Sequence, residues 1–262
     1  MIRSASMSFI VALALVGFAA AARADDPPSA ADIVAAADRV RNPEQPFRLT
    51  MALVEYRRGT ARDSVTLSVH SKIDSAAHQY RNLVRYVAPA RDAGKLVLLS
   101  GGSLWFYDPT SKASIRISAQ QRLIGQASNG DVLTVNLAHD YTPHLLGSER
   151  IEDADHQTRD TWHLDLKAAT PEAAYARLET WIEKGTMRPV KSRFYSDSGR
   201  ALKLAYYRRY ELALGAARPL EIIIVDGVDS HLVTKVTASA YRTEDVKETW
   251  FQREYLARFS EE

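Results

Sequence analysis

Hydrophobic and polar positions alternate with a period of two along most of residues 47–242. Val65, Leu67 and Val69, for example, alternate with polar neighbours. Such alternation is typical of strands in a sheet with one apolar and one polar face. It predicts strands at residues 47–56, 65–70, 79–87, 95–100, 104–107, 113–118, 145–151, 162–167, 175–183, 190–195, 201–210, 220–226 and 232–242.

Short turns, and not helical crossovers, join nearly all of these segments. Ser196-Asp-Ser-Gly199, between two strand patterns, is a strong hairpin signal. The sheet should therefore be antiparallel. Because open sheets rarely exceed about ten strands without curling or splitting, we expect a mainly β fold with a few helices: a curled antiparallel sheet, a half-barrel, of about 11–12 strands lidded by short helices. Larger barrels can enclose a ligand cavity.

Helical patterns occur in three places. Ser29 and Asp32 form a capping arrangement for a helix that should end by Arg41, before Asn42-Pro43. Residues 120–126 and 131–138 can each form one or two turns around the loop Ala127-Ser-Asn-Gly130. Near the end, Thr249 with Gln252 predicts a last helix that carries Trp250, Tyr255, Leu256 and Phe259.

The functional prediction depends most on the segment Leu104–Asp140, which is predicted to form a hairpin followed by a lid. Its first part, to Ser118, reads as a hairpin, and Asp108-Pro-Thr-Ser111 supplies the turn. Its second part, Ala119–Asp140, reads as an apolar lid over one end of the curled sheet. The cavity candidates are Leu83, Trp105, Tyr107, Ile115 and Ile117 on the sheet and Leu123, Ile124, Leu133 and Leu137 on the lid.

Residues 1–24 differ in kind from the rest. Phe9–Phe18 is an apolar run after a weakly positive start, and Ala22-Arg-Ala24 fits the small-x-small cleavage rule. The alternative, an uncleaved membrane anchor, needs a span of about 18–20 residues, which this run does not reach. We predict a signal peptide at 1–24, cleaved after Ala24, and one exported domain at 25–262.

Composition narrows the function further. The chain is 46% hydrophobic and 25% charged, with 34 basic and 32 acidic residues, and cleavage would remove Arg3 and Arg23 to leave 32 of each. This balance gives no electrostatic case for nucleic acid. The absence of cysteine excludes disulfides and the lipidation site of a lipoprotein.

Catalytic motifs are scarce. The sequence has no HExxH, GxSxG, GxxxxGK or GxGxxG pattern. His139-Asp140 with His144 is the nearest approach to a metal cluster, but the spacing matches no standard ligand set. We therefore expect no catalytic residue, metal or cofactor. An enzyme with a dispersed active site is the least favoured of three hypotheses.

Leu104-Trp-Phe-Tyr-Asp-Pro109, preceded by Asn82-Leu-Val84 and the connection Pro89–Leu99, resembles the LolA-like periplasmic lipoprotein carriers and their outer-membrane lipoprotein-sorting relatives. Tyr175–Trp181 and Arg188–Tyr195 are similar to the extended relatives. The resemblance implies a lidded half-barrel around a hydrophobic cavity for acyl chains. Arg81 stands just before Asn82, where the carrier has a functional arginine, with Tyr80 as the competing position. The loop Gly125–Asp131 has no counterpart in the carrier.

The leading hypothesis is a monomeric periplasmic carrier of lipoprotein acyl chains or other lipids toward the outer membrane. The alternative, which the resemblance to the extended relatives implies, is a non-enzymatic periplasmic adaptor of an envelope transporter of the RND type. Arg81 is a possible polar contact for lid or cargo.

Overall fold

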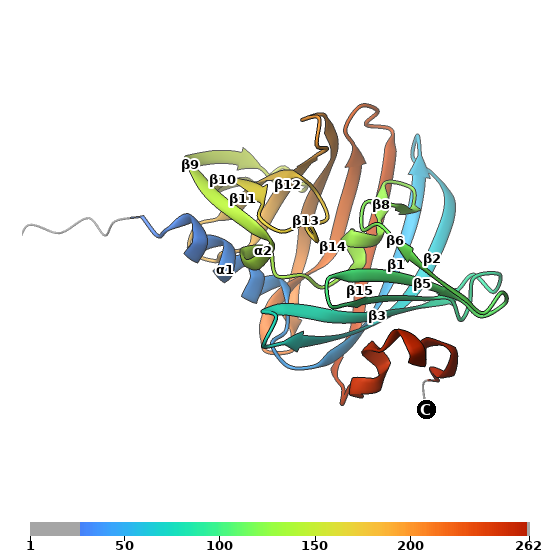
Figure 1. The fold of residues 1–262 in the computed structure, drawn as a ribbon. Helices are drawn as coiled ribbons and strands as arrows, with labels where there is room; N and C mark the ends of the chain where they lie inside the picture. The colour runs from blue at the N-terminus through green and yellow to red at the C-terminus, as the bar shows by residue number, and fades with distance from the viewer. Residues whose placement is uncertain (1–26, 261–262) are drawn as a thin grey trace, which may run out of the picture.

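The computed structural model describes residues 27–260, so the predicted signal peptide lies outside the described residues. Thirteen strands form one curled sheet in the order β6-β5-β4-β3-β2-β1-β15-β14-β13-β12-β11-β10-β9, which does not close into a barrel (Figure 1). The strands are β1 (Phe47–Arg57), β2 (Thr60–Asp74), β3 (Gln79–Ala88), β4 (Leu96–Ser100), β5 (Ser103–Asp108), β6 (Ala113–Ile117), β9 (Tyr141–Glu152), β10 (Thr158–Ala168), β11 (Arg177–Glu183), β12 (Pro189–Tyr195), β13 (Ala201–Ala213), β14 (Ala216–Asp226) and β15 (Leu232–Thr243). The predicted mainly β, curled antiparallel fold is confirmed.

The strand order explains why the sheet needs a lid. The first strand, β1, pairs with both β2 and the last strand, β15, so the two ends of the sheet-forming chain meet in the middle of the sheet. The two edge strands, β6 and β9, lie at opposite ends of the sheet. Among the strands of this sheet, however, they follow one another directly along the chain. Residues 118–140 must therefore run from one edge to the other, and they do so across the concave face (Figure 1). We call residues 118–140 the lid.

The lid is less helical than the sequence predicts. Its elements are β7 (Arg122–Ile124), β8 (Ala127–Ser128), the 3₁₀ turn η1 (Asn129–Val132) and the single helical turn α2 (Leu137–Asp140). Gly125, with φ of +53°, makes a tight reversal that pairs β7 with β8, so no helix forms over 120–126. The stretch between η1 and α2 is bonded to sheet side chains, which replace the backbone bonds of a helix.

Helix α1 (Ala30–Arg41) follows the predicted bounds. The Ser29 hydroxyl accepts a hydrogen bond from the Asp32 backbone N–H at 3.1 Å, and the helix ends at Arg41, with Asn42 as its C-cap before Pro43. Its buried residues Ile33 and Val34 pack in one cluster with Leu164, Leu166 and Leu178 of the sheet. Helix α1 therefore covers the half of the concave side that β9, β10 and β11 form.

The predicted tail helix is two 3₁₀ helices, η2 (Glu248–Phe251) and η3 (Arg253–Arg258). The extended backbone of Gln252, with φ of −107° and ψ of 127°, separates them. Trp250, Phe251 and Leu256 are buried on the outer face of the sheet, against β3, β4 and β5 (Figure 1). Within residues 27–260, no helix is long and apolar enough to cross a membrane.

Candidate functional site: a lidded cavity

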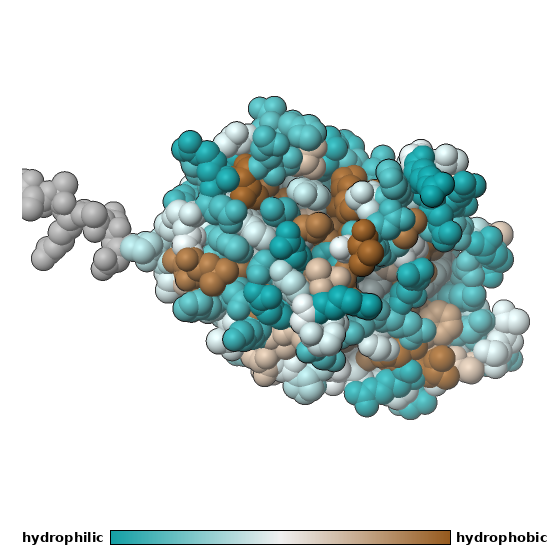
Figure 2. Space-filling view, turned by 90° about the horizontal axis from the view of Figure 1, so that it is seen from above, coloured by the Kyte–Doolittle hydropathy of each residue, from teal (hydrophilic) through white to brown (hydrophobic). Residues whose placement is uncertain are grey.

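A cavity of about 560 Å³ lies between the lid and the concave face of the sheet. Both halves of the sheet contribute apolar side chains to it, and the lid adds others. They are Leu99, Leu104 and Ile117 on one side, Leu178, Phe194, Ala205, Ile222 and Ile224 on the other, and Leu133, Val135 and Leu137 from the lid. Figure 2 shows apolar side chains within hollows of a largely hydrophilic surface.

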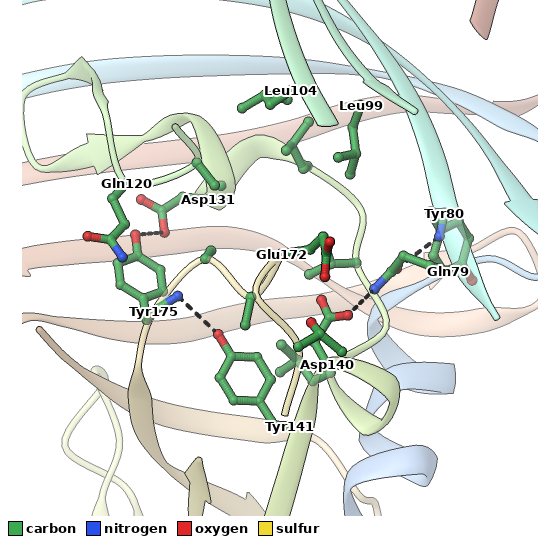
Figure 3. Close-up of a pocket in the computed structure, with 18 of the residues that line it drawn as sticks. Gln79, Tyr80, Leu99, Leu104, Gln120, Asp131, Asp140, Tyr141, Glu172 and Tyr175 are labelled. Carbon is green, nitrogen blue, oxygen red and sulfur yellow. Dashed lines mark hydrogen bonds between the residues drawn. The ribbon is translucent and has the colours of Figure 1, made fainter. Parts of the chain in front are cut away.

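Polar side chains border this cavity on several sides, opposite Leu99 and Leu104 (Figure 3). Gln79 Nε2 donates to Asp140 Oδ1 at 2.8 Å, and the Tyr175 backbone N–H donates to the Tyr141 hydroxyl at 3.2 Å. Glu172 is exposed and lies so close to Gly102 that a Cβ placed there would be 2.7 Å from Glu172 Cγ. The β10–β11 connection therefore touches the β4–β5 turn, and these two loops form an edge of the cavity.

Side chains of β3 and of the α1–β1 connection hold the second half of the lid. The Asn82 carboxamide bonds to both backbone groups of Thr134: Thr134 N donates to Oδ1 at 2.9 Å, and Nδ2 donates to Thr134 O at 2.8 Å. Gln79 Oε1 accepts from Asn136 N at 2.7 Å. Asn42 Nδ2 donates to Val135 O at 2.8 Å. These bonds satisfy the extended backbone over a cavity that offers no partner strand.

A buried ion pair holds the first half of the lid. Lys203 of β13 pairs with Asp131 of η1, and their side chains are only 6% and 10% exposed. The Tyr175 hydroxyl donates to Asp131 Oδ1 at 3.0 Å and lies 2.6 Å from Ser128 Oγ. Burial raises the pKa of Tyr175 well above its ordinary value, and the nearby Asp131 carboxylate raises it further. Tyr175 therefore stays a neutral donor.

Helix α1 supports α2 through one carboxylate. Asp38 Oδ2 accepts from the backbone N–H of Ala138 at 2.8 Å, and Asp38 also pairs with Arg41. Burial raises the pKa of Asp38, against the opposing effect of Arg41. Arg41 lines the cavity, where its charge is already matched by Asp38.

Three of the predicted cavity residues line the cavity: Ile117, Leu133 and Leu137. Ile124 is buried and Leu123 half-buried in the core cluster beside it, where β7 packs on the sheet. Ile115 faces the same way as Ile117 along β6 but is 55% exposed because β6 is an edge strand.

Leu83, Trp105 and Tyr107 lie on the opposite face, and their assignment to the cavity was wrong. All three pack beneath η2 and η3 in one outer cluster. The alternation along β5 sends Leu104 and Phe106 inward, so Trp105 and Tyr107 point outward. The run of aromatic residues in β5 did not indicate which side chains face the cavity, because apolar side chains cover both faces of this strand.

Arg81 lies at the cavity rim, but its bonds run outward. It pairs with Glu248 of η2 at 2.8 Å, and its guanidinium lies 5.2 Å from the Phe251 ring centre. Tyr80 is buried and donates to Pro43 O at 3.0 Å. Arg81 therefore ties the C-terminal turns to the sheet.

The sequence patterns did not identify the polar residues that hold the lid: Asn82, Asp131, Tyr175 and Lys203. One signal was available for Lys203, because it shares the inward parity of Ala205 in β13 and so had to be buried with a partner. Asn82 and Tyr175 carried no comparable signal.

His139 and Asp140 also belong to this lid scaffold. His139 Nδ1 lies 3.0 Å from Asp140 Oδ1, which Gln79 also contacts, whereas His144 is on β9 opposite Asp165. Over residues 27–260, no three His, Asp or Glu side chains are grouped to hold a metal ion.

A family model described only as an uncharacterized-protein-like family matches residues 78–258. A LolA superfamily protein of Nitrosomonas europaea is 31% identical, with a TM-score of 0.77, over 87% of this chain and 100% of its own. No curated protein matches the chain.

Two further solved structures share the fold. An outer membrane lipoprotein-sorting protein domain of Vibrio parahaemolyticus is 17% identical, with a TM-score of 0.72, over 87% of this chain and 98% of its own. A DUF1329 family protein of Desulfovibrio piger is 20% identical, with a TM-score of 0.72, over 87% of this chain and 97% of its own.

Proposed function

Because this chain belongs to the LolA superfamily, we propose that it is a non-enzymatic periplasmic carrier that shelters an acyl chain of a lipoprotein or lipid on its way toward the outer membrane. The proposal includes export by the signal peptide at 1–24, with cleavage after Ala24. The observation that carries it is the lidded cavity with an apolar wall from both halves of the sheet.

The size of the cavity matches such a cargo. If a methylene takes about 30 Å³, the share of one water molecule in the liquid, the cavity of about 560 Å³ holds one chain of about 18 carbons. Each methylene removed from water contributes about 0.8 kcal/mol, so about a dozen of them supply on the order of 10 kcal/mol. That free energy suffices for transport without any chemical step.

Extraction of the purified protein for mass spectrometry, together with titration of a fluorescent fatty-acyl ligand, tests the proposal. We expect a co-purified or exchangeable single-chain species at 1:1 stoichiometry. Leu133→Glu places a charge against the cavity wall and should abolish binding. Leu212→Glu is the matched control, because Leu212 is 81% exposed and does not line the cavity.

The same pair of variants separates a carrier from a transporter adaptor. If Leu133→Glu removes lipid binding but leaves the cellular phenotype and a membrane-partner pull-down intact, the cavity is not what the cell uses. A folded wild-type protein that neither retains nor binds an acyl chain would refute the carrier function.

A further inference from the structure

A second cavity, of about 340 Å³, lies beside the first. Gln120 and Tyr175 line both cavities, so they stand at the boundary between them. Other walls of the second cavity come from the β7–β8 reversal of the lid, the start of β13 and the turn after β14. The second cavity therefore adjoins the first at the β7–β8 part of the lid.

The lining of the second cavity carries an excess of positive charge. Its charged residues are Arg122, Arg200, Lys203 and Asp226. Lys203 is neutralised by Asp131, so it adds little net charge. Arg122 and Arg200 are exposed, and their guanidinium groups have no ion-pair partner among residues 27–260.

Asp226 does not offset these two cations fully. Its Oδ1 accepts from the backbone N–H groups of Val228, at 2.9 Å, and Asp229, at 3.0 Å. The Asp226 carboxylate is thus already bonded within the β14–β15 turn. The cavity carries two guanidinium groups, those of Arg122 and Arg200, for this one carboxylate. Guanidinium groups bind phosphate and carboxylate through paired, charge-assisted hydrogen bonds.

We propose that the second cavity is a binding site for an anionic group, a phosphate or carboxylate, held by Arg122 and Arg200. In the carrier this group is the head of an amphiphile whose chain lies in the first cavity, an assignment that rests on the proposed function. The shared boundary at Gln120 and Tyr175 makes the two sites neighbours, so one molecule can occupy both.

The test compares two ligands with the same acyl chain, a lysophosphatidic acid and the neutral monoacylglycerol. We expect wild type to bind the phosphate ligand about tenfold more tightly, since about 1.4 kcal/mol from charge-assisted bonds corresponds to a factor of ten. Arg122→Gln with Arg200→Gln should remove this preference and leave monoacylglycerol binding unchanged.

Two control variants keep the result interpretable. Arg150→Gln with Arg242→Gln makes the same change of charge at exposed positions that line neither cavity, and it should keep the preference. Arg122→Lys with Arg200→Lys keeps the charge but not the paired geometry, and it should restore part of the preference. A thermal melt of each variant confirms that it folds.

Titration with inorganic phosphate identifies the source of the anion. Phosphate binding that depends on Arg122 and Arg200, without a preference between the two lipids, supports the anion site and overturns the headgroup assignment. If neither phosphate nor the phosphate lipid responds to the glutamine variants, the anion site is refuted. Failure of monoacylglycerol alone to bind counts against the acyl carrier and not against the anion site.

Discussion

The Asn82 carboxamide pairs with the Thr134 backbone as a neighbouring strand would, with N···O distances of 2.8 and 2.9 Å. Asn82 is fully buried and Thr134 is 7% exposed. One side chain thus replaces the missing strand partner where the lid crosses the cavity.

Asn82→Ala should lower the free energy of unfolding by about 1–3 kcal/mol, because both Thr134 groups stay buried without a partner. Asn82→Asp should also destabilise, since a carboxylate can accept from Thr134 N but cannot donate to Thr134 O. Urea denaturation measures both effects. The control is Gln157→Ala, because Gln157 is exposed. Equal stability of wild type and Asn82→Ala would show that the clamp contributes nothing.

The buried pair Lys203–Asp131 gives a second stability prediction. Lys203→Met leaves the Asp131 carboxylate buried without its cation and should cost about 3–5 kcal/mol. Adding Asp131→Asn to Lys203→Met should recover part of that loss, as a double-mutant cycle in urea would show. Arg150→Met, which breaks the exposed pair with Asp160, should cost less than about 1 kcal/mol. Additive losses at 203 and 131 would contradict the coupling.

The sheet could be predicted from sequence because its signal is periodic and local. Val65, Leu67 and Val69 point to one face whatever their distant partners are, and all three are buried in the core cluster. The pairing of β1 with β15 was not predictable in the same way, because it joins residues about 190 positions apart through contacts that no local pattern encodes.

The face that each strand turns to the cavity was harder to predict. Leu104 and Trp105 are both apolar, and only the burial of Trp105 under Arg253 and the C-terminal turns settles which one faces outward. The secondary structure of the lid was hard to predict for another reason. The lid is held by side chains such as Asn82, so its sequence need not follow a helical or strand period.

Stability should depend on pH through His163, on the outer face. Its ring stacks on Trp181 at 4.2 Å between centres, and burial lowers its pKa below the ordinary 6.5 although Glu149 and Glu179 oppose the change. Because the folded state disfavours the proton, the contribution of His163 to stability is complete above pH 6.5 and is lost as the pH drops toward the folded pKa.

His163→Gln should therefore lose less stability than wild type between pH 7 and 5, by urea denaturation at each pH. His156→Gln is the matched control, since the His156 side chain is 89% exposed. An identical pH dependence in His163→Gln and wild type would refute the lowered pKa.

Filling the cavity should block the cargo without unfolding the protein. Ala205 is buried, lines the cavity and has open volume before it, so Ala205→Phe should reduce fluorescent fatty-acyl binding at least about tenfold, as one buried aromatic ring occupies the volume of several methylenes. The melting temperature should stay near that of wild type. Ala168→Phe, at an exposed position of β10, is the control and should bind normally. Unchanged affinity in Ala205→Phe would place the ligand elsewhere.

The contact between Gly102 and Glu172 predicts that cargo enters the cavity between the β4–β5 turn and the β10–β11 connection. A Cβ at Gly102 would lie 2.7 Å from Glu172 Cγ, so the side chains of cysteines at these two positions would be in contact, and the chain has no cysteine of its own to compete. In Gly102→Cys with Glu172→Cys, oxidation should slow association of the fluorescent acyl ligand at least about tenfold, because these two loops then stay joined over the cavity. Reduction should restore the wild-type rate, although cysteine at the positive φ of Gly102 costs some stability. Stopped-flow fluorescence measures both states, with each single cysteine variant as control. Equal association rates before and after reduction would mean that cargo passes by another route.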